Sequence, residues 1–305
     1  MEKHRKKLIK NAAVFDGHSS GLAHGKKIVI EDDLVTEITG DEVSEENFGE
    51  VFDGTGMVAM PGMTDAHVHM GCLFAKGEFP VDYATVLTVA KCKDALMAGF
   101  TTFRDAGSVS EGLKLAFDEG VLPGPRIYPC GAYISQTCGH GDSEYAHTYR
   151  DIQYRHPSST VLADGVPEII RAVREQFYRG ASHIKLMATE ILNRHEDIRL
   201  LFGTDMMITG PDYQVEQSED IRYYEKRFGT MRALRALTGT ANEVFALTTY
   251  QNPYPKGKIG VLEAGAFADL LLVDGDPTKR VSVLADTDHL RLIMKGGTVY
   301  KNTLC

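Results

Sequence analysis

The middle of the chain alternates between segments patterned as helices and segments patterned as strands. Apolar residues recur at helical spacing in four stretches, residues 82–98, 110–119, 167–179 and 218–237. Short apolar runs that suit strands occur at residues 101–103, 126–134, 182–187 and 199–202. Helices that alternate with strands in this way imply parallel strands, so the pattern favours an α/β fold with a barrel as the leading candidate.

Both ends of the chain are rich in short strands instead. Residues 27–30 and 34–38 flank a Glu-Asp-Asp turn, and residues 290–295 and 298–301 flank Gly-Gly, which is a strong hairpin signal. We therefore expect a small β-sandwich domain built from both termini, residues 1–60 and 246–305. The barrel segment, residues 61–245, would be inserted into it.

Composition narrows the classes of partner. The chain has 305 residues, of which 43% are hydrophobic, and a formal net charge of −9, which argues against nucleic acid as the main partner. No apolar stretch approaches the ~20 residues that span a bilayer, so no membrane partner is expected. The five cysteines form no Cys-x-x-Cys pair and are odd in number, which favours a reducing, cytoplasmic location.

Two histidines, His67 and His69, follow an apolar run at residues 57–63. Side chains two residues apart on a strand point to the same side, so this pair offers two nitrogen ligands to one metal ion. On an isolated strand such a pair is more often incidental. The neighbouring residues and the rest of the chain must therefore decide between the two interpretations.

A series of segments along nearly the whole chain resembles the amidohydrolase superfamily, in particular its imidazolonepropionase- and prolidase-like branch. They are residues 61–69, 99–105, 124–127, 135–141, 184–189, 202–205, 258–260 and 265–270. The resemblance implies a metal-binding TIM-like barrel with its site at the carboxyl ends of the strands.

The resemblance also implies roles for individual residues. His67 and His69 match the metal pair of the first barrel strand, and Asp205 matches an aspartate that binds metal and shuttles protons. Lys185 matches a lysine that such enzymes carboxylate, because an unmodified lysine is a cation and a poor ligand. The cofactor would be one or two divalent ions, with zinc expected and manganese, iron or cobalt as alternatives.

The implied reaction is hydrolysis of a C–N bond in an amide, cyclic amide or dipeptide by a metal-activated water. The partner would then be a small amide or peptide-like substrate. His140, in a glycine-rich loop, is a candidate substrate contact, although a plain loop histidine explains it equally well. Asp205 in Gly-Thr-Asp could also be a helix cap or a turn residue.

One interval departs from the family pattern. Two further histidines, from the fifth and sixth strands, would fall within residues 186–204, where only His195 occurs. A barrel unit takes roughly 30 residues, so this interval cannot hold even one. We expect an incomplete barrel that lacks strands 5–7, with open edges and exposed apolar faces that could lead to a homo-oligomer. The alternative function is a non-catalytic remnant with an incomplete metal site.

Overall fold

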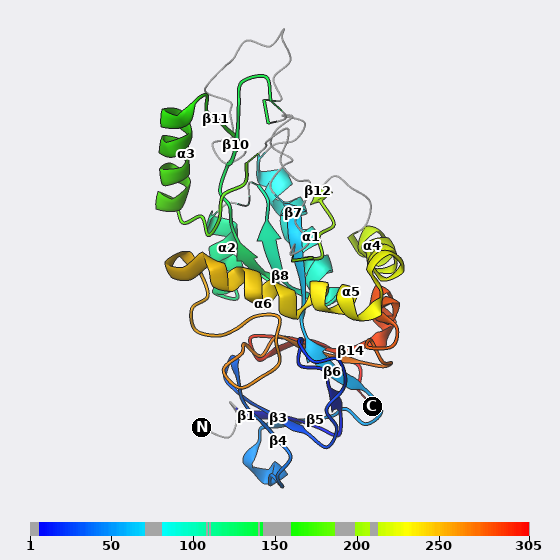
Figure 1. The fold of residues 1–305 in the computed structure, drawn as a ribbon. Helices are drawn as coiled ribbons and strands as arrows, with labels where there is room; N and C mark the ends of the chain where they lie inside the picture. Colours follow the sequence, from blue (N-terminus) through cyan, green and yellow to red (C-terminus); the bar gives the residue numbers. More distant parts are fainter. Residues whose placement is uncertain are drawn as a thin grey trace.

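The computed structural model describes residues 6–70, 81–107, 109, 111–139, 141–142, 160–186, 199–207 and 213–304. These residues form two four-stranded sheets, one five-stranded sheet and one two-stranded sheet. Figure 1 shows the β-rich end, which also carries both chain ends, below the part that contains most of the helices.

Two sheets at this end draw strands from both ends of the chain. The first has the order β4 (Leu34–Thr39), β3 (Lys27–Glu31), β1 (Lys6–Lys10) and β5 (Glu50–Asp53). The second has the order β15 (Thr298–Asn302), β14 (Leu290–Lys295), β13 (Leu270–Val273), β6 (Val58–Pro61) and β2 (Ala13–Val14). Both expected hairpins, β3–β4 and β14–β15, are confirmed.

The two terminal sheets share an apolar core. Ile9 and Ile28 of the first sheet belong to the same buried cluster as Leu270, Leu272 and Leu292 of the second. Residues from both sheets pack in this one cluster, so each sheet covers an apolar face of the other. The division of the chain into domains at residues 60 and 246 stays a prediction.

The middle of the chain forms a parallel sheet with the order β12 (Met206–Met207), β7 (Met63–His69), β8 (Phe100–Asp105) and β9 (Arg126–Tyr128). Helix α1 (Val81–Met97) connects β7 to β8, and α2 (Glu111–Asp118) connects β8 to β9. The expected mixed α/β fold with parallel strands is confirmed. Over the described residues this sheet has open ends at β12 and β9.

The strand expected over residues 126–134 is divided into two. Gly131, with a φ of 68°, separates β9 from β10 (Tyr133–Ser135), because this left-handed conformation interrupts a strand. β10 pairs with β11 (Thr160–Leu162), and helix α3 (Val166–Tyr178) follows. Ile134 also donates a backbone hydrogen bond to Lys185, which brings residues 182–186 alongside β10.

The segment that follows residue 198 differs from expectation. Residues 199–202 form no strand; the chain instead runs beside β7, where the amide of Ala66 donates to Phe202 and the amide of Asp205 donates to His67. Regular pairing begins only at β12. The helix expected over residues 218–237 is divided at Gly229, whose φ is 82°, into α4 (Tyr213–Phe228) and α5 (Thr230–Leu237).

Short helices complete the described chain. They are η2 (Glu45–Asn47), α6 (Gly239–Phe245), η4 (Ala246–Gln251), η5 (Val281–Ala285) and η6 (Thr287–His289). None of the described helices combines the length and the apolar character that crossing a membrane requires.

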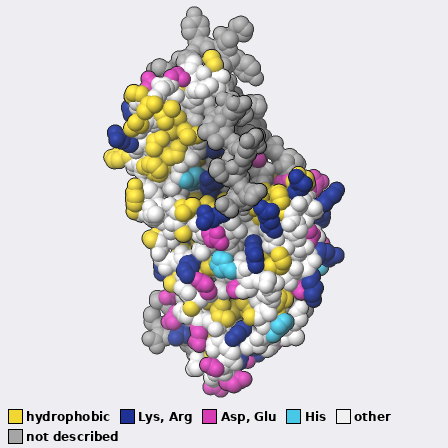
Figure 2. Space-filling view, in the orientation of Figure 1, with side chains coloured by type: hydrophobic (Ala, Val, Ile, Leu, Met, Phe, Trp, Pro, Cys, Tyr) yellow, Lys and Arg dark blue, Asp and Glu magenta, His cyan; other side chains and the backbone are white. Residues whose placement is uncertain are grey.

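Helix α3 exposes several apolar side chains. Val166, Ile170 and Tyr178 have exposed fractions of 68%, 43% and 91%, and the hydrophobic patch at the upper left of Figure 2 lies over this helix. These side chains agree with the expectation that apolar surface is exposed. Self-association itself stays a prediction.

Candidate metal centre

Strand β7 supplies two imidazoles to the centre. His67 and His69 alternate with the fully buried Val68, so both rings lie on the same side of the strand. Their Nε2 atoms are 3.2 Å apart. The ring of His69 is almost completely buried and that of His67 is 39% exposed, so the pair is open to solvent on one side.

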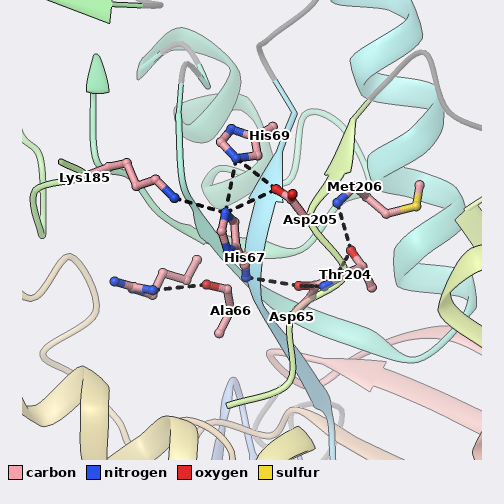
Figure 3. A network of polar contacts seen from close by, with 9 residues as sticks. Asp65, Ala66, His67, His69, Lys185, Thr204, Asp205 and Met206 are labelled. Atoms are coloured by element: carbon pink, nitrogen blue, oxygen red, sulfur yellow. Dashed lines mark hydrogen bonds and ion pairs between the residues drawn. The ribbon is translucent and has the colours of Figure 1, made fainter. Parts of the chain in front are cut away.

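The third donor comes from the segment that runs beside β7. Oδ1 of Asp205 lies 3.2 Å from Nε2 of His67 and 3.2 Å from Nε2 of His69. The amide of Asp205 donates to the carbonyl of His67, so backbone pairing holds this carboxylate over the two rings. Figure 3 shows the three side chains converging.

This donor set fits a single divalent ion. His67, His69 and Asp205 offer two imidazole nitrogens and one carboxylate oxygen that are mutually 3.2 Å apart. Ligand atoms that share one ion at ~2.1 Å, with octahedral to tetrahedral angles, lie about 3.0–3.4 Å apart. Three protein ligands with an open position are also the usual count of a catalytic zinc site.

Burial prepares the two imidazoles for this role. Burial, reinforced by the neighbouring His67, lowers the pKa of His69 to about 4. Burial and the cation of Lys185 also lower the pKa of His67, against an opposing effect of Asp205. Both rings are therefore neutral at pH 7, and a neutral ring nitrogen is the form that binds a metal.

Lys185 is the fourth sequence-predicted residue at the centre. It lies beside β10, and its Nζ is 3.2 Å from Nε2 of His67. Figure 3 shows the lysine approaching His67 from the side opposite Asp205. As a cation it would oppose a metal ion, whereas its carbamate would be an anionic oxygen ligand.

A second carboxylate, that of Asp65, supports the centre, and the sequence analysis gave it no role. Oδ1 of Asp65 accepts hydrogen bonds from the amides of His67 at 3.1 Å and Thr204 at 3.2 Å. Oδ2 accepts from the hydroxyl of Thr204 at 2.7 Å. The available signal was its position two residues before His67, which places it on the same side of the strand.

Gly203 allows the close approach of the two segments. A Cβ at this position would lie 2.7 Å from Cβ of His67 and 3.3 Å from its amide nitrogen. Any larger residue would push the Asp205 segment away from β7. The glycine before Thr204 is therefore a geometric requirement of the centre.

His140 and His195 lie outside the described residues. The interval in which the two further metal ligands were expected, residues 186–204, is described only at Leu186 and at residues 199–204. Among the described residues, His67, His69 and Asp205 are the group whose donor atoms converge for a metal.

Comparison with known proteins agrees with this picture. Residues 58–198, which include both histidines and Lys185, match the amidohydrolase family. The match covers a little under half of the chain, so over these residues the chain resembles that family. The members named below are hydrolytic enzymes.

Two curated relatives match this chain over part of their length. Ochratoxinase from Aspergillus niger is 34% identical over 152 residues, which cover 43% of this chain and 31% of the relative. The 5-methylthioadenosine/S-adenosylhomocysteine deaminase of Dictyoglomus turgidum is 31% identical over 70 residues, 23% of this chain and 16% of the relative. The chain thus spans about a third of the length of the ochratoxinase.

Solved structures share the fold over nearly the whole chain. A crystal structure of an amidohydrolase has a TM-score of 0.84 at 23% identity and covers 98% of this chain and 100% of its own. The Aspergillus niger ochratoxinase has a TM-score of 0.77 at 18% identity, covering 98% and 96%. A Xaa-Pro dipeptidase with bound methionine has a TM-score of 0.76 at 19% identity, covering 97% and 100%.

Proposed function

We propose that this chain is an amidohydrolase, a metal-dependent hydrolase that cleaves the C–N bond of a small amide, cyclic amide or dipeptide. The observation that carries the proposal is the convergence of His67, His69 and Asp205, whose donor atoms are mutually 3.2 Å apart. These residues come from two segments that are far apart in sequence, so their approach is a property of the fold.

The three residues would hold one divalent ion, for which zinc suits the mixed nitrogen and oxygen donors. When bound, such an ion supplies Lewis acidity, which activates water for attack and polarises an amide carbonyl. The neutral imidazoles of His67 and His69 would bind it without first releasing a proton at pH 7.

Asp205 would also carry the proton. Its side chain is 72% exposed, whereas that of His69 is 9% exposed, so the carboxylate lies at the solvent side of the centre, where a substrate would arrive. A carboxylate in this position can accept a proton from the attacking water and deliver it to the leaving nitrogen. The leaving amine then departs as a neutral molecule.

Lys185 would join the ligand set as a carbamate. Its neutral amine would attack CO2, form an N–C bond and lose one proton, which replaces a cation beside His67 with an anion. Nζ lies 3.2 Å from Nε2 of His67. This distance supports the role, because the carbamate oxygens would extend beyond Nζ and lie close to the other candidate ligands. The location of such a hydrolase in the cytoplasm remains part of the proposal.

Amide bonds are the substrate class because the named relatives and neighbours include an ochratoxinase and a Xaa-Pro dipeptidase. The test is a hydrolysis assay of the full chain, loaded with zinc, manganese or cobalt in bicarbonate buffer. Its substrates are N-acyl amino acids, Xaa-Pro dipeptides and cyclic amides. Asp205→Asn should lower the rate by at least 10²-fold, as loss of a general base does.

The matched control is Asp94→Asn on the exposed face of α1, which should leave the rate unchanged. Metal-loaded protein that turns over none of the three substrate classes would contradict hydrolysis of amides. Protein that binds no metal at all would favour the non-catalytic remnant.

A further inference from the structure

Thr204 occupies a central position between β7 and the Asp205 segment. Its hydroxyl donates to Oδ2 of Asp65 at 2.7 Å and accepts from the amide of Met206 at 3.1 Å. Its own amide donates to Oδ1 of Asp65 at 3.2 Å. The hydroxyl therefore connects the strand that carries both histidines to the residues on either side of Asp205.

Asp65 is anchored firmly enough to act as the fixed end of this connection. Its side chain is fully buried, and Oδ1 also accepts the amide of His67 at 3.1 Å. A buried carboxylate that accepts several hydrogen bonds is held in one rotamer, since any other would leave its charge unpaired. Thr204 is thus tied to a group that cannot easily move.

Asp205 itself has a backbone conformation that needs support. Its φ is 58°, in the left-handed region that residues with a Cβ adopt at a cost, although aspartate tolerates it better than most. The hydrogen bonds of Thr204 and Met206 flank this residue on both sides. With both neighbours tied down, the left-handed conformation is the one that keeps the carboxylate over the histidines.

We propose that Asp65 and Thr204 are positioning residues, which set the carboxylate of Asp205 against His67 and His69 without touching the metal or the substrate. This inference rests on the proposed metal centre and adds the device that assembles it. Groups that orient metal ligands in this way typically change metal affinity 10–100-fold when they are removed.

The experiment compares zinc affinity among variants of the full chain, by competition with a chromophoric chelator. Thr204→Val keeps the size of the side chain and the charge of Asp65 but removes the hydroxyl. We expect its dissociation constant for zinc to rise by about tenfold or more. Thr204→Ser restores the hydroxyl, so its affinity should return to within about threefold of the wild-type value.

Thr278→Val is the matched control for loss of a threonine hydroxyl bond. Thr278 donates its amide and its hydroxyl to Asp276 in the loop after β13, away from the centre. The Thr278→Val variant should have the same zinc affinity as the wild type, even if the substitution lowers the melting temperature as much as Thr204→Val does. Equal affinity of Thr204→Val and wild type, or a serine variant as weak as the valine variant, would overturn the proposal.

Crystal structures of the metal-free wild type and Thr204→Val provide a test that needs no metal. In the valine variant we expect Asp205 to leave the left-handed region and its carboxylate to move out of contact with both histidines. An unchanged Asp205 in that variant would also overturn the proposal. A wild type that binds no zinc would instead contradict the proposed function, and these two structures would still decide the role of Thr204.

Discussion

The amine nitrogen of Lys185 lies 3.2 Å from Nε2 of His67, although the two residues are 118 positions apart in the sequence. The segment of Lys185 lies beside β10, which belongs to a different sheet from β7, so tertiary packing brings the two residues together. A cation at this place repels a divalent ion, and a carbamate attracts it. The chemical state of Lys185 should therefore control metal binding.

Bicarbonate should strengthen zinc binding through Lys185. We expect the dissociation constant of the wild type to fall by about tenfold between CO2-free and bicarbonate-saturated buffer, a change typical for one ligand or its supporting group. Lys185→Met should remove this response, because it has no amine to carboxylate. Lys93→Met, at an exposed position of α1, is the control. A bicarbonate response that survives in Lys185→Met would assign the effect to another group.

Gly203→Ala should separate the Asp205 segment from β7. The new Cβ would lie 2.7 Å from Cβ of His67, so one segment must shift, at a cost of about 1–3 kcal/mol in the free energy of unfolding. Zinc affinity should fall as well. Gly112→Ala on α2 is the control, since nothing lies within 4 Å of its Cβ, and it should be neutral or slightly stabilising. Urea unfolding measures both variants.

Asp269→Asn should destabilise the junction between the parallel sheet and the terminal sheets. Both oxygens of Asp269 accept from Arg126, at 2.9 and 3.2 Å, and the amide of Gly296 donates to it at 2.7 Å. Losing the charge leaves a buried guanidinium without its partner, which costs about 3–5 kcal/mol.

The exposed pair of Arg199 and Glu243 is the control for this ion pair. Glu243→Gln should change the free energy of unfolding by less than about 1 kcal/mol. If Asp269→Asn proved as mild as this surface variant in urea unfolding, the buried pair would contribute far less to the junction than its geometry indicates.

Stability should depend on pH through Asp105, which lies at the end of β8. Burial raises the pKa of this carboxyl to about 7, against about 4 in an unfolded chain. Between about pH 4 and pH 7, Asp105 keeps its proton in the folded state and has lost it in the unfolded state. The free energy of unfolding therefore falls as the pH rises through this range. The fall would amount to about 4 kcal/mol at most.

Asp105→Asn should lack this fall because its amide does not titrate. Urea unfolding of both proteins at pH 4.5 and pH 8 measures the effect. We expect the free energy of unfolding of the wild type, relative to that of the variant, to be greater at pH 4.5 than at pH 8. Parallel pH profiles of the two proteins would mean that the carboxyl ionises normally.

The structure brings together three of the residues that were predicted as metal ligands, but it divides or omits several of the predicted strands and helices. His67 and His69 were predictable because alternation along a strand is a local property. Lys185 and Asp205 were found only through the family resemblance, since neither residue has a local pattern that marks it. The left-handed φ of Asp205 and the backbone pairing of residues 202–207 with β7 arise from tertiary contacts, which no local pattern encodes.

Two of the errors in element boundaries have a common cause. Gly131 and Gly229 each adopt a positive φ and divide an element that was predicted as continuous. Glycine occurs inside helices and strands as well as at their ends, so the apolar pattern on both sides of it suggests one continuous element. Asp65 was passed over for a different reason: its partner Thr204 is distant in sequence and becomes visible only in the folded chain.

The most direct test of the account is the amount of metal that the chain binds. Wild-type protein equilibrated with zinc and bicarbonate, then desalted, should retain about one equivalent of zinc per chain by mass spectrometry of the metal. The double variant His67→Asn/His69→Asn should retain less than about a tenth of an equivalent, while the control His18→Asn/His24→Asn, at exposed positions, should match the wild type. Wild-type protein that retains no more zinc than the His67→Asn/His69→Asn variant would contradict the metal centre.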